Sequence, residues 1–447
     1  MMSATIRIKK GLKINLLGEP KKEISKIEAG NFAIKPTDFI GVFPRLLVKE
    51  GDIVKAGTPL FIDKYRENII FSASVSGVVE EINRGEKRVL EEIRIKADNE
   101  QLFEDFGEAD PGNAGREAII EKLLKSGAWP MIRQRPYSTI ANPADKPKAI
   151  YVSGFDSAPL APDYSFVVNE NVTDFQAGID TLASIAGRNV KLGLPGGHSD
   201  FPKVSNADIT YFNGPHPAGN VGIQIHHTSP LNKGEIVWVV KLQDVIIIGR
   251  LFRLGRFDTS ILIPLCGSEV KNPRYFRTKK GASVKAFIED NLQDGSQRII
   301  SGNVLTGRQI RSDGYLGFYH DQFTVIPEGN YHEFFGWALP GLKKFSISKT
   351  YFSWFSPNRK FRLDTNFHGA ERAYVMTGQY ENVLPMDIFP MQLIKACLAE
   401  NIELMENLGI YEVDEEDFAL VEFIDTSKTE IQTIIRNGLN LIRKEMS

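Results

Sequence analysis

The chain has 447 residues, with 54 Lys or Arg against 56 Asp or Glu, so its formal net charge is −2 and its pI is near 6.4. Apolar residues at 42% and charged residues at 25% are typical of globular proteins and exclude disordered, collagen-like and coiled-coil chains. This balanced charge excludes nucleic acid as an expected partner, because nucleic-acid binding needs a clustered basic surface. The length predicts about three domains.

No run of about 18 apolar residues occurs, so the sequence predicts no transmembrane helix. Charged residues interrupt the most apolar stretch, 236–252. The N-terminus lacks the apolar core of a signal peptide, and we therefore expect a cytoplasmic protein. The two cysteines, Cys266 and Cys397, are too few and too isolated for a zinc site or a disulfide framework, so we expect both to be core residues.

The first hundred residues predict a small β unit. Segment 42–60 carries two glycine turn signals, and segment 71–82 repeats a strand–glycine–strand pattern, which indicates a small sandwich or barrel. Both segments resemble the half-barrel repeats of biotinyl and lipoyl carrier domains, in which a lysine at a tight hairpin tip receives the prosthetic group. Lys64 stands near that position, but residues 65–70 are expected to lengthen the connection, so we expect the fold without the modification.

An acidic stretch with three glycines, 98–115, predicts a linker, and alternating helices and strands follow it to about residue 257. Helices are expected at 116–125 and 175–186, strands at 148–152 and 189–194, and long apolar runs at 237–248. Strands that alternate with helices predict an α/β layer architecture.

Strands return between about 259 and 345, around one expected helix at 284–288, which predicts a compact β-rich unit. The last 60 residues turn helical. One helix is expected to begin at Pro390 and to close at Gly409. A second, amphipathic helix is expected at 429–445 because its isoleucines recur with helical spacing.

The residues alone indicate no catalytic residue, cofactor site or metal site. Segment 192–200 lacks the spacing of a dinucleotide-binding loop, and no phosphate loop or nucleophile elbow occurs. His226 and His227 are adjacent, so on a strand they would point to opposite faces and could not chelate one ion. His198 and His216 are expected in turns.

Eight segments spread over essentially the whole chain resemble one family, the A subunit of the bacterial Na+-translocating NADH:quinone oxidoreductase. Each segment is weakly specific alone, but their combination in this order is highly specific. The family is in turn similar to the C subunit of the Rnf redox complexes and, more distantly, to the flavin-bearing NADH-binding subunit of respiratory complex I. The segments are I-R-I-K-K-G-L (6–12), N-R-G-E-K-R-V-L (83–90), G-P-H-P-A-G (214–219), Q-D-V-I (243–246), G-R-L-F (249–252), R-I-I-S-G-N-V-L-T-G (298–307), F-G-W-A-L-P-G (335–341) and V-L-P-M-D (383–387).

The resemblance implies a multidomain α+β fold with four domains. Residues 1–105 would form a carrier-like barrel-sandwich domain, and 106–257 a degenerate Rossmann-like domain of the flavin-binding type. Residues 258–345 would form a β-grasp domain of the SLBB type. Residues 346–447 would form a helical domain that resembles a ferredoxin domain without its cluster cysteines.

The cofactor motifs of these relatives are altered here. Ferredoxin-type clusters need C-x2-C-x2-C-x3-C-P because four thiolates must surround each cluster. That frame fits 374–385 and 413–424, and we expect side chains to fill the cluster volume. The cysteine positions hold Tyr374, Thr377, Tyr380 and Leu384 in one frame, and Val413, Glu416, Ala419 and Phe423 in the other. Segments 124–130 and 153–159 have likewise lost the glycine run and the turn that face a nucleotide in the relatives, so no bound flavin is expected.

The resemblance also implies a function. The chain would be a peripheral subunit of a six-subunit complex, on the cytoplasmic face of the bacterial inner membrane, that passes electrons from NADH to ubiquinone and exports Na+. FAD, FMN, riboflavin and a [2Fe–2S] centre are expected on integral membrane and flavin-bearing partner subunits, and the isolated chain is not expected to be catalytic. Two alternatives stay open: a soluble flavin-dependent NADH dehydrogenase, and an acyl-carrier protein that uses Lys64.

A quinone site is expected near the vacated flavin cleft, at the carboxyl ends of the strands. Trp129 and Tyr137 would offer flat apolar faces to the ring, while Arg133 and Arg135 would donate hydrogen bonds to its oxygens. His216 is a further candidate from the G-P-H-P-A-G turn. The alternative is that these residues pack the empty cleft and pair with acidic neighbours.

Overall fold

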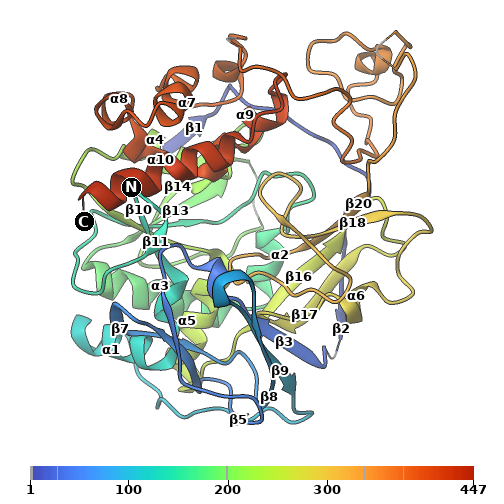
Figure 1. Cartoon of the computed structure of the whole chain (residues 1–447). Coiled ribbons are helices and arrows are strands. Elements are labelled where there is room, and N and C mark those ends of the chain that lie inside the picture. Colours follow the sequence, from blue (N-terminus) through green and yellow to red (C-terminus); the bar gives the residue numbers. More distant parts are fainter. Residues whose placement is uncertain (1–3, 28, 198–199, 337, 376, 447) are drawn as a thin grey trace.

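The computed structural model describes residues 4–27, 29–197, 200–336, 338–375 and 377–446 (Figure 1). Its strands form sheets of seven, six, four and three strands. Two large hydrophobic cores hold them together. No helix among these described residues combines the length and apolarity needed to span a bilayer.

Two small antiparallel sheets form the expected β unit. The four-stranded sheet has the order β3-β9-β8-β5, and the three-stranded sheet the order β4-β6-β7. The strands are β3 (Asn31–Ile34), β4 (Pro44–Leu46), β5 (Ile53–Val54), β6 (Pro59–Asp63), β7 (Arg66–Ser72), β8 (Gly77–Arg84) and β9 (Leu90–Ala97). The expectation that residues 65–70 lengthen the β6–β7 connection is wrong, because β7 starts at Arg66 and the turn consists of Lys64 and Tyr65.

The first two strands lie outside this unit. Strand β1 (Ala4–Arg7) extends the seven-stranded sheet, and β2 (Lys21–Lys26) extends the six-stranded one. Between them, Ile8, Ile14 and Leu16 pack into the core of the C-terminal helices. The N-terminal segment therefore ties together three parts of the molecule that lie far apart in the sequence.

The seven-stranded sheet has the order β1-β14-β13-β12-β15-β10-β11, and its first five strands are parallel. The strands are β10 (Ile132–Arg135), β11 (Thr139–Ile140), β12 (Ile150–Ser153), β13 (Val190–Pro195), β14 (Ala207–Asn213) and β15 (Val237–Val240). The helices are α1 (Arg116–Ser126), α2 (Tyr164–Asn169), α3 (Val172–Ala186), α4 (Val221–Thr228) and α5 (Leu242–Leu254). The predicted α/β alternation is confirmed, and the apolar run 237–248 divides into a buried strand and the start of a buried helix.

The six-stranded sheet forms the predicted β-rich unit, with the order β19-β18-β20-β16-β17-β2. Its strands are β16 (Ser260–Cys266), β17 (Arg274–Lys279), β18 (Gln297–Ser301), β19 (Arg308–Ile310) and β20 (Phe323–Pro327), and its helix is α6 (Lys285–Ile288). The predicted helix at 284–288 is confirmed, with Phe287 turned into the core.

The C-terminal helices are α7 (Pro390–Leu398), α8 (Ile402–Asn407), α9 (Ala419–Ile424) and α10 (Ile431–Met446). The prediction of one helix from Pro390 to Gly409 is wrong. Glu400 takes a φ of +51°, and the Asn401 side chain accepts a hydrogen bond from the Leu404 amide, which starts a second helix. The predicted amphipathic helix is confirmed as α10 (Figure 1, red).

Candidate functional site

A cleft of about 660 Å³ opens where the seven-stranded sheet, the β-rich unit and the C-terminal helices meet. A smaller cavity of about 100 Å³ shares Arg133, Lys241, Thr306 and Glu416 with it. Ser153 and Val240 place this cavity at the carboxyl ends of β12 and β15. That is the usual ligand position in open α/β sheets.

His216 lines the smaller cavity and is only 6% exposed. Its Nδ1 lies 3.0 Å from Ser157 Oγ, which itself accepts a hydrogen bond from the Gly219 amide at 2.8 Å. Burial lowers the pKa of His216 to about 4, so the ring is neutral at pH 7. In the tautomer whose Nδ1 accepts from the Ser157 hydroxyl, the ring proton lies on Nε2. Nε2 is buried and has no hydrogen-bond partner among the described residues.

Two cations, Arg133 and Lys241, also line this cavity. The Arg133 guanidinium lies over the Tyr319 ring, 4.9 Å from its centroid, and Lys241 Nζ donates to the Tyr319 carbonyl oxygen. Phe155 and Val239 add apolar lining. The sequence analysis did not single out Lys241, although it is the first polar residue after the apolar β15 strand, a signal that could have identified it.

The remaining predicted site residues do not line the cleft or the smaller cavity. Trp129 is fully buried, donates from Nε1 to the Ala141 carbonyl oxygen at 2.8 Å, and packs edge-on against Trp238. Arg135 is 3% exposed and is engaged by carboxylates. Tyr137 is half-buried, with its ring edge-on to Tyr411. The structure thus brings Arg133 and His216 together at one cavity. Trp129 packs in the core and Arg135 pairs with acidic residues, as the alternative prediction describes.

The carboxylates around Arg135 belong to a group that we call the buried charge cluster. Arg135 Nη1 donates to Asp417 at 2.9 Å, and the same guanidinium pairs with Glu416 and, at 3.6 Å, with Asp414. Arg436 on α10 pairs with Asp414 and Glu415. The cluster consists of Arg135, Asp414, Glu415, Glu416, Asp417 and Arg436.

Burial and neighbouring charges shift the pKa values of these carboxyl groups in opposite directions. Burial raises the pKa of Asp417 to about 6, and burial together with the Asp414 charge raises the pKa of Glu415 to about 7. Against the effect of its own burial, Arg436 and Arg135 hold the pKa of Asp414 below its usual value. The two arginines therefore stabilise a charged junction between the α/β sheet and the C-terminal helices.

The residues in the two cluster frames do not fit an iron–sulfur cluster. Tyr380 and Leu384 in one frame, and Val413 and Ala419 in the other, are core residues less than 3% exposed, and Tyr380 donates from its hydroxyl to Asp425 at 2.7 Å. In the described ranges, no group of three or more His, Cys, Asp or Glu could hold a metal ion. Both cysteines are buried and free, which confirms them as core residues.

The segment 124–130 does not fit a flavin phosphate either. Gly127 ends α1 with a φ of +79°, and a Cβ there would lie 2.3 Å from Ser72 Oγ. This glycine is therefore required by close packing against β7. The short helix that follows, Trp129–Met131, is buried, so the segment joins the core and offers no open backbone to an anion.

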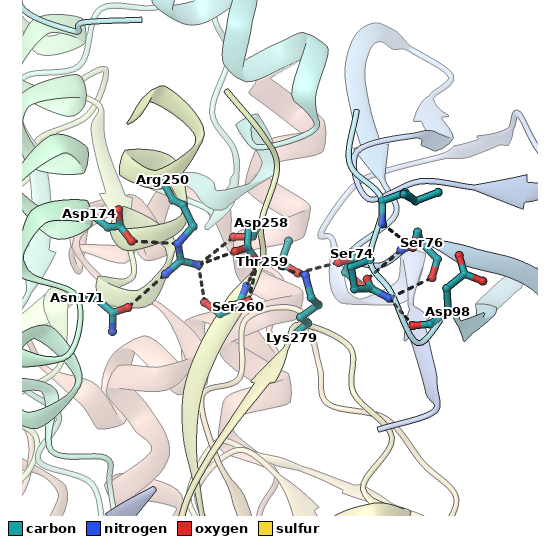
Figure 2. Close-up of polar contacts among 12 residues, drawn as sticks. Ser74, Ser76, Asp98, Asn171, Asp174, Arg250, Asp258, Thr259, Ser260 and Lys279 are labelled. Atoms are coloured by element: carbon teal, nitrogen blue, oxygen red, sulfur yellow. Dashed lines mark hydrogen bonds and ion pairs between the residues drawn. The ribbon is translucent and has the colours of Figure 1, made fainter. Parts of the chain in front are cut away.

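A row of polar contacts fixes the units that carry the cleft (Figure 2). Arg250 on α5 donates to Asp174 on α3 at 3.0 Å and to the Asp258 carbonyl oxygen at 3.1 Å. Thr259 continues the row by donating to the Ser74 carbonyl oxygen in the β unit at 3.1 Å. The α/β sheet, the β-rich unit and the β unit are thus joined by partly or fully buried hydrogen bonds, which gives the cleft fixed walls.

The other singled-out histidines form no common site. His226 and His227 lie on α4, so the premise that they lie on a strand is wrong. His226 pairs with Glu412 at 2.7 Å, and His227 bonds the Pro385 carbonyl oxygen at 2.9 Å, so both hold α4 against the C-terminal region. His198 lies outside the described residues.

Comparison with known families matches most of the chain. The models of the NqrA N-terminal barrel-sandwich hybrid domain, the NqrA second alpha/beta domain and the NQRA C-terminal domain match residues 6–98, 114–257 and 262–312. The A subunits of the Na(+)-translocating NADH-quinone reductases of Hahella chejuensis, Yersinia pestis and Neisseria meningitidis serogroup B are each 38% identical to this chain, over 98% of this chain and 100% of each relative. A solved NAD+-reducing [NiFe]-hydrogenase in the H2-reduced state is much more distant, with 11% identity and a TM-score of 0.39 over 75% of this chain and 62% of that one.

Proposed function

Because this chain belongs to the family of the A subunits of Na+-translocating NADH-quinone reductases, we propose that it works as a peripheral subunit of such a reductase on the cytoplasmic face of the inner membrane. Its partners in a six-subunit complex would be the integral membrane and flavin-bearing subunits. These partners would carry FAD, FMN, riboflavin and the [2Fe–2S] centre, and would pass electrons from NADH to ubiquinone while Na+ is exported. The domains matched between residues 6 and 312, together with the relatives that are 38% identical over 98% of this chain, support this role.

Within this role, the smaller cavity is our candidate for a ubiquinone head group. The observation that carries the proposal is the buried Nε2 of His216, which lines a cavity and has no hydrogen-bond partner among the described residues. A buried donor without a partner costs free energy, and a ligand that accepts its hydrogen bond recovers that cost. A quinone carbonyl oxygen is such an acceptor.

The residues of the cavity match the chemistry of a quinone ring. His216 would donate to one carbonyl oxygen, and Arg133 or Lys241 to the other, while Phe155 and Val239 would contact the flat faces. The two cations would also stabilise negative charge that develops on the head group during reduction. Trp129, Arg135 and Tyr137 would support this wall from behind, since Arg135 holds the end of β10, the strand that carries Arg133.

Titration of the purified chain with a soluble short-chain ubiquinone, followed by the ¹⁵N resonances of the histidine rings, tests the site. We expect the His216 signal to shift, and the affinity to fall about tenfold in Arg133→Gln and in His216→Asn, which is the loss of one hydrogen bond to a charged or buried group. Arg188→Gln and His227→Asn are matched controls outside the cavity. Unchanged affinity in both cavity variants would place the quinone elsewhere in the complex.

The finer division of the fold is also a proposal: a carrier-like domain at 1–105, a degenerate flavin-type domain at 106–257, an SLBB-type β-grasp domain at 258–345 and a cluster-free helical domain at 346–447. Consistent with this division, the first range holds the two small sheets, the second and third each hold most of one larger sheet, and the fourth holds the C-terminal helices. We expect the purified chain to be colourless, and stoichiometric flavin or cluster absorption bands would contradict this.

Lys64 lies in a tight turn between two strands, which is where a carrier domain would hold its lipoyl group. An increase in the intact mass of the chain by one lipoyl group would reveal that modification.

A further inference from the structure

Residues 331–375, which we call the aromatic arm, expose an unusual amount of apolar surface. Phe334 is 87% exposed, Phe355 66% and Trp354 43%, although large apolar side chains on soluble proteins usually pack inside. A large group of exposed apolar side chains of this kind marks an interaction surface. The exposed large apolar residues of the arm are Tyr331, Phe334, Phe335, Leu339, Leu342, Ile347, Phe352, Trp354, Phe355, Phe367 and Val375.

The base of the arm is fixed, while its outer part projects from the body. The Leu17 amide donates to the Phe361 carbonyl oxygen and the Phe361 amide to the Asn15 carbonyl oxygen, at 2.9 and 2.8 Å. Arg362 pairs with the buried Glu269 at 2.8 Å. Beyond these anchors the arm forms the loose orange excursion beside β20 (Figure 1). The fold therefore positions the arm without covering it.

The short helix Phe352–Phe355 is the one helix or named strand in the described part of the arm, and its aromatic side chains point outward. The rings of Trp354 and Phe355 stack with centroids 4.1 Å apart, and the Phe352 ring lies 6.0 Å from that of Phe355. All three side chains are more than 40% exposed. The helix thus presents one aromatic face to the surroundings.

The arm is also cationic, with seven Lys or Arg against three Asp or Glu. Glu333 pairs with Lys344, and Asp364 accepts from the Tyr331 hydroxyl, so two of the three acids are engaged within the arm. Four cations of the arm have no ion-pair partner among the described residues: Lys343, Lys349, Arg359 and Arg372. Positive charge therefore surrounds the exposed rings.

We propose that the aromatic arm lies on the membrane surface and contacts anionic phospholipid. Aromatic rings settle at the level of the lipid headgroups, and nearby Lys and Arg are attracted to anionic lipids. At that level water still forms hydrogen bonds with the backbone N–H and C=O groups of the irregular arm, whereas in the hydrocarbon interior these groups would have no partners. The inference rests on the proposed function, which puts the chain beside a membrane.

The positive charge of the arm favours anionic lipid, rather than the cytoplasmic loops of an integral subunit, as its binding partner. Such loops carry an excess of Lys and Arg, because positive residues are retained on the cytoplasmic side during insertion. A cationic arm would be repelled by them, whereas an anionic bilayer attracts it. The arm therefore adds a lipid contact to the docking that partner subunits provide.

Flotation of the full-length chain with lipid vesicles tests the proposal. We expect binding to vesicles of phosphatidylethanolamine and phosphatidylglycerol, weaker binding at higher salt, and little binding to phosphatidylcholine alone. Trp354→Ser with Phe355→Ser, and separately Lys343→Gln with Lys349→Gln, should each reduce the bound fraction about tenfold or more. Circular dichroism should show both variants folded, because the replaced side chains are exposed.

Two matched double variants control for composition. Phe43→Ser with Tyr65→Ser removes an exposed aromatic pair of the β unit, and Lys9→Gln with Lys10→Gln removes two exposed cations near the N-terminus; neither should change vesicle binding. In the unaltered chain, brominated lipid should quench tryptophan fluorescence, and Trp354→Phe should reduce that quenching.

Absence of binding to anionic vesicles at low salt, or equal binding by the arm variants, would overturn the proposal. Binding that requires membranes with the integral subunits would make the arm a protein-docking surface instead. Failure of the proposed function looks different: the chain would bind anionic vesicles through its arm but would not co-purify with flavin-containing integral subunits.

Discussion

The buried charge cluster and the aromatic arm reverse the usual distribution of side chains in opposite ways. The cluster encloses charged side chains, with Arg135 3% and Asp417 1% exposed, whereas the arm leaves Phe334 87% exposed. Buried charges are tolerated where ion pairs and hydrogen bonds compensate their loss of water. Here Arg135 and Arg436 supply that compensation from within the chain.

The arm has no comparable compensation within the chain. Its exposed rings stack on one another but stay in contact with water, and four of its cations have no ion pair among the described residues. The comparison teaches that arginines of the same chain pair the carboxylates of the cluster, apart from Asp417 Oδ1, which has no hydrogen-bond partner among the described residues, while the arm presents its rings and cations to the surroundings. Changes to each region should separate these two roles, from the largest expected effect to the smallest.

Arg135→Ala should be the most destabilising of these changes. It leaves the buried Asp414 and Asp417 without one of their cations, which typically costs about 3–5 kcal/mol in the free energy of unfolding. Urea unfolding followed by circular dichroism measures this cost. Arg45→Ala breaks an exposed pair with Glu67 and should cost about 0–1 kcal/mol. Equal costs for the two variants would mean that the cluster does not stabilise the junction.

The stability that Asp417 and Glu415 contribute should fall as the pH rises from about 4 to about 7, whereas buried His216, whose pKa is lowered to about 4, acts in the opposite direction over the same range. The pKa values of Asp417, about 6, and Glu415, about 7, lie above those of the unfolded chain, so the folded state binds more protons in this window. The stabilisation from these groups is complete below the unfolded pKa values and is lost as the pH passes the folded ones. For Asp417 the loss amounts to at most about 3 kcal/mol.

Thermal unfolding between pH 4.5 and 7.5 checks this sign. The stability difference between the unaltered chain and Asp417→Asn isolates this carboxyl group, since the amide cannot titrate, and this difference should fall as the pH rises; Glu371→Gln on the exposed arm should leave the pH dependence as it is. A stability difference that rises with pH, or one that stays constant, would contradict the raised pKa of Asp417.

Limited proteolysis should separate the two regions by rate. Trypsin should cut first after Lys343, Lys349 or Arg359, because exposed segments without regular structure open at little cost. Cleavage after Arg436, which pairs with Asp414 and Glu415, requires unfolding of the junction. Mass spectrometry of the first fragments identifies the first cleavage sites. A first cut within the C-terminal helices would contradict the expected order of cleavage.

Phe334→Ala should have the smallest effect on stability. An exposed side chain contributes about 0.5 kcal/mol or less to folding. Ile435→Ala on α10, a fully buried position, should by contrast cost about 2–5 kcal/mol. If Phe334→Ala were as costly as Ile435→Ala, the arm would be part of the folded core.

Local patterns predicted most of the elements. The α/β alternation, the β-rich unit and α10 followed from periodicity and turn residues, because these signals act within a few residues. The break at Glu400 was missed because Asn401 competes as a helix cap with an otherwise continuous apolar spacing. The positions of β1 and β2 were missed because their partners are distant in sequence.

The candidate site was predicted in part. The rule for ligands at the carboxyl ends of parallel strands led to Arg133 and His216, but side-chain direction lies beyond any single-sequence pattern. Trp129 points into the core and Arg135 toward acids almost 300 residues away in the chain, and no local signal carries that information. The acidic run 414–417 has no Lys or Arg within ten residues of it in the sequence. Its two arginines come from other elements, which only the fold reveals.

Hydrogen exchange of the isolated chain, with and without anionic vesicles, tests the contrast between the two regions most directly. We predict that residues 331–360 of the arm exchange fast in the free chain and become protected on vesicles, while peptides that cover 410–436 are protected in both. A protected arm in the free chain, an arm that vesicles leave unprotected, or fast exchange at 410–436 would contradict the account.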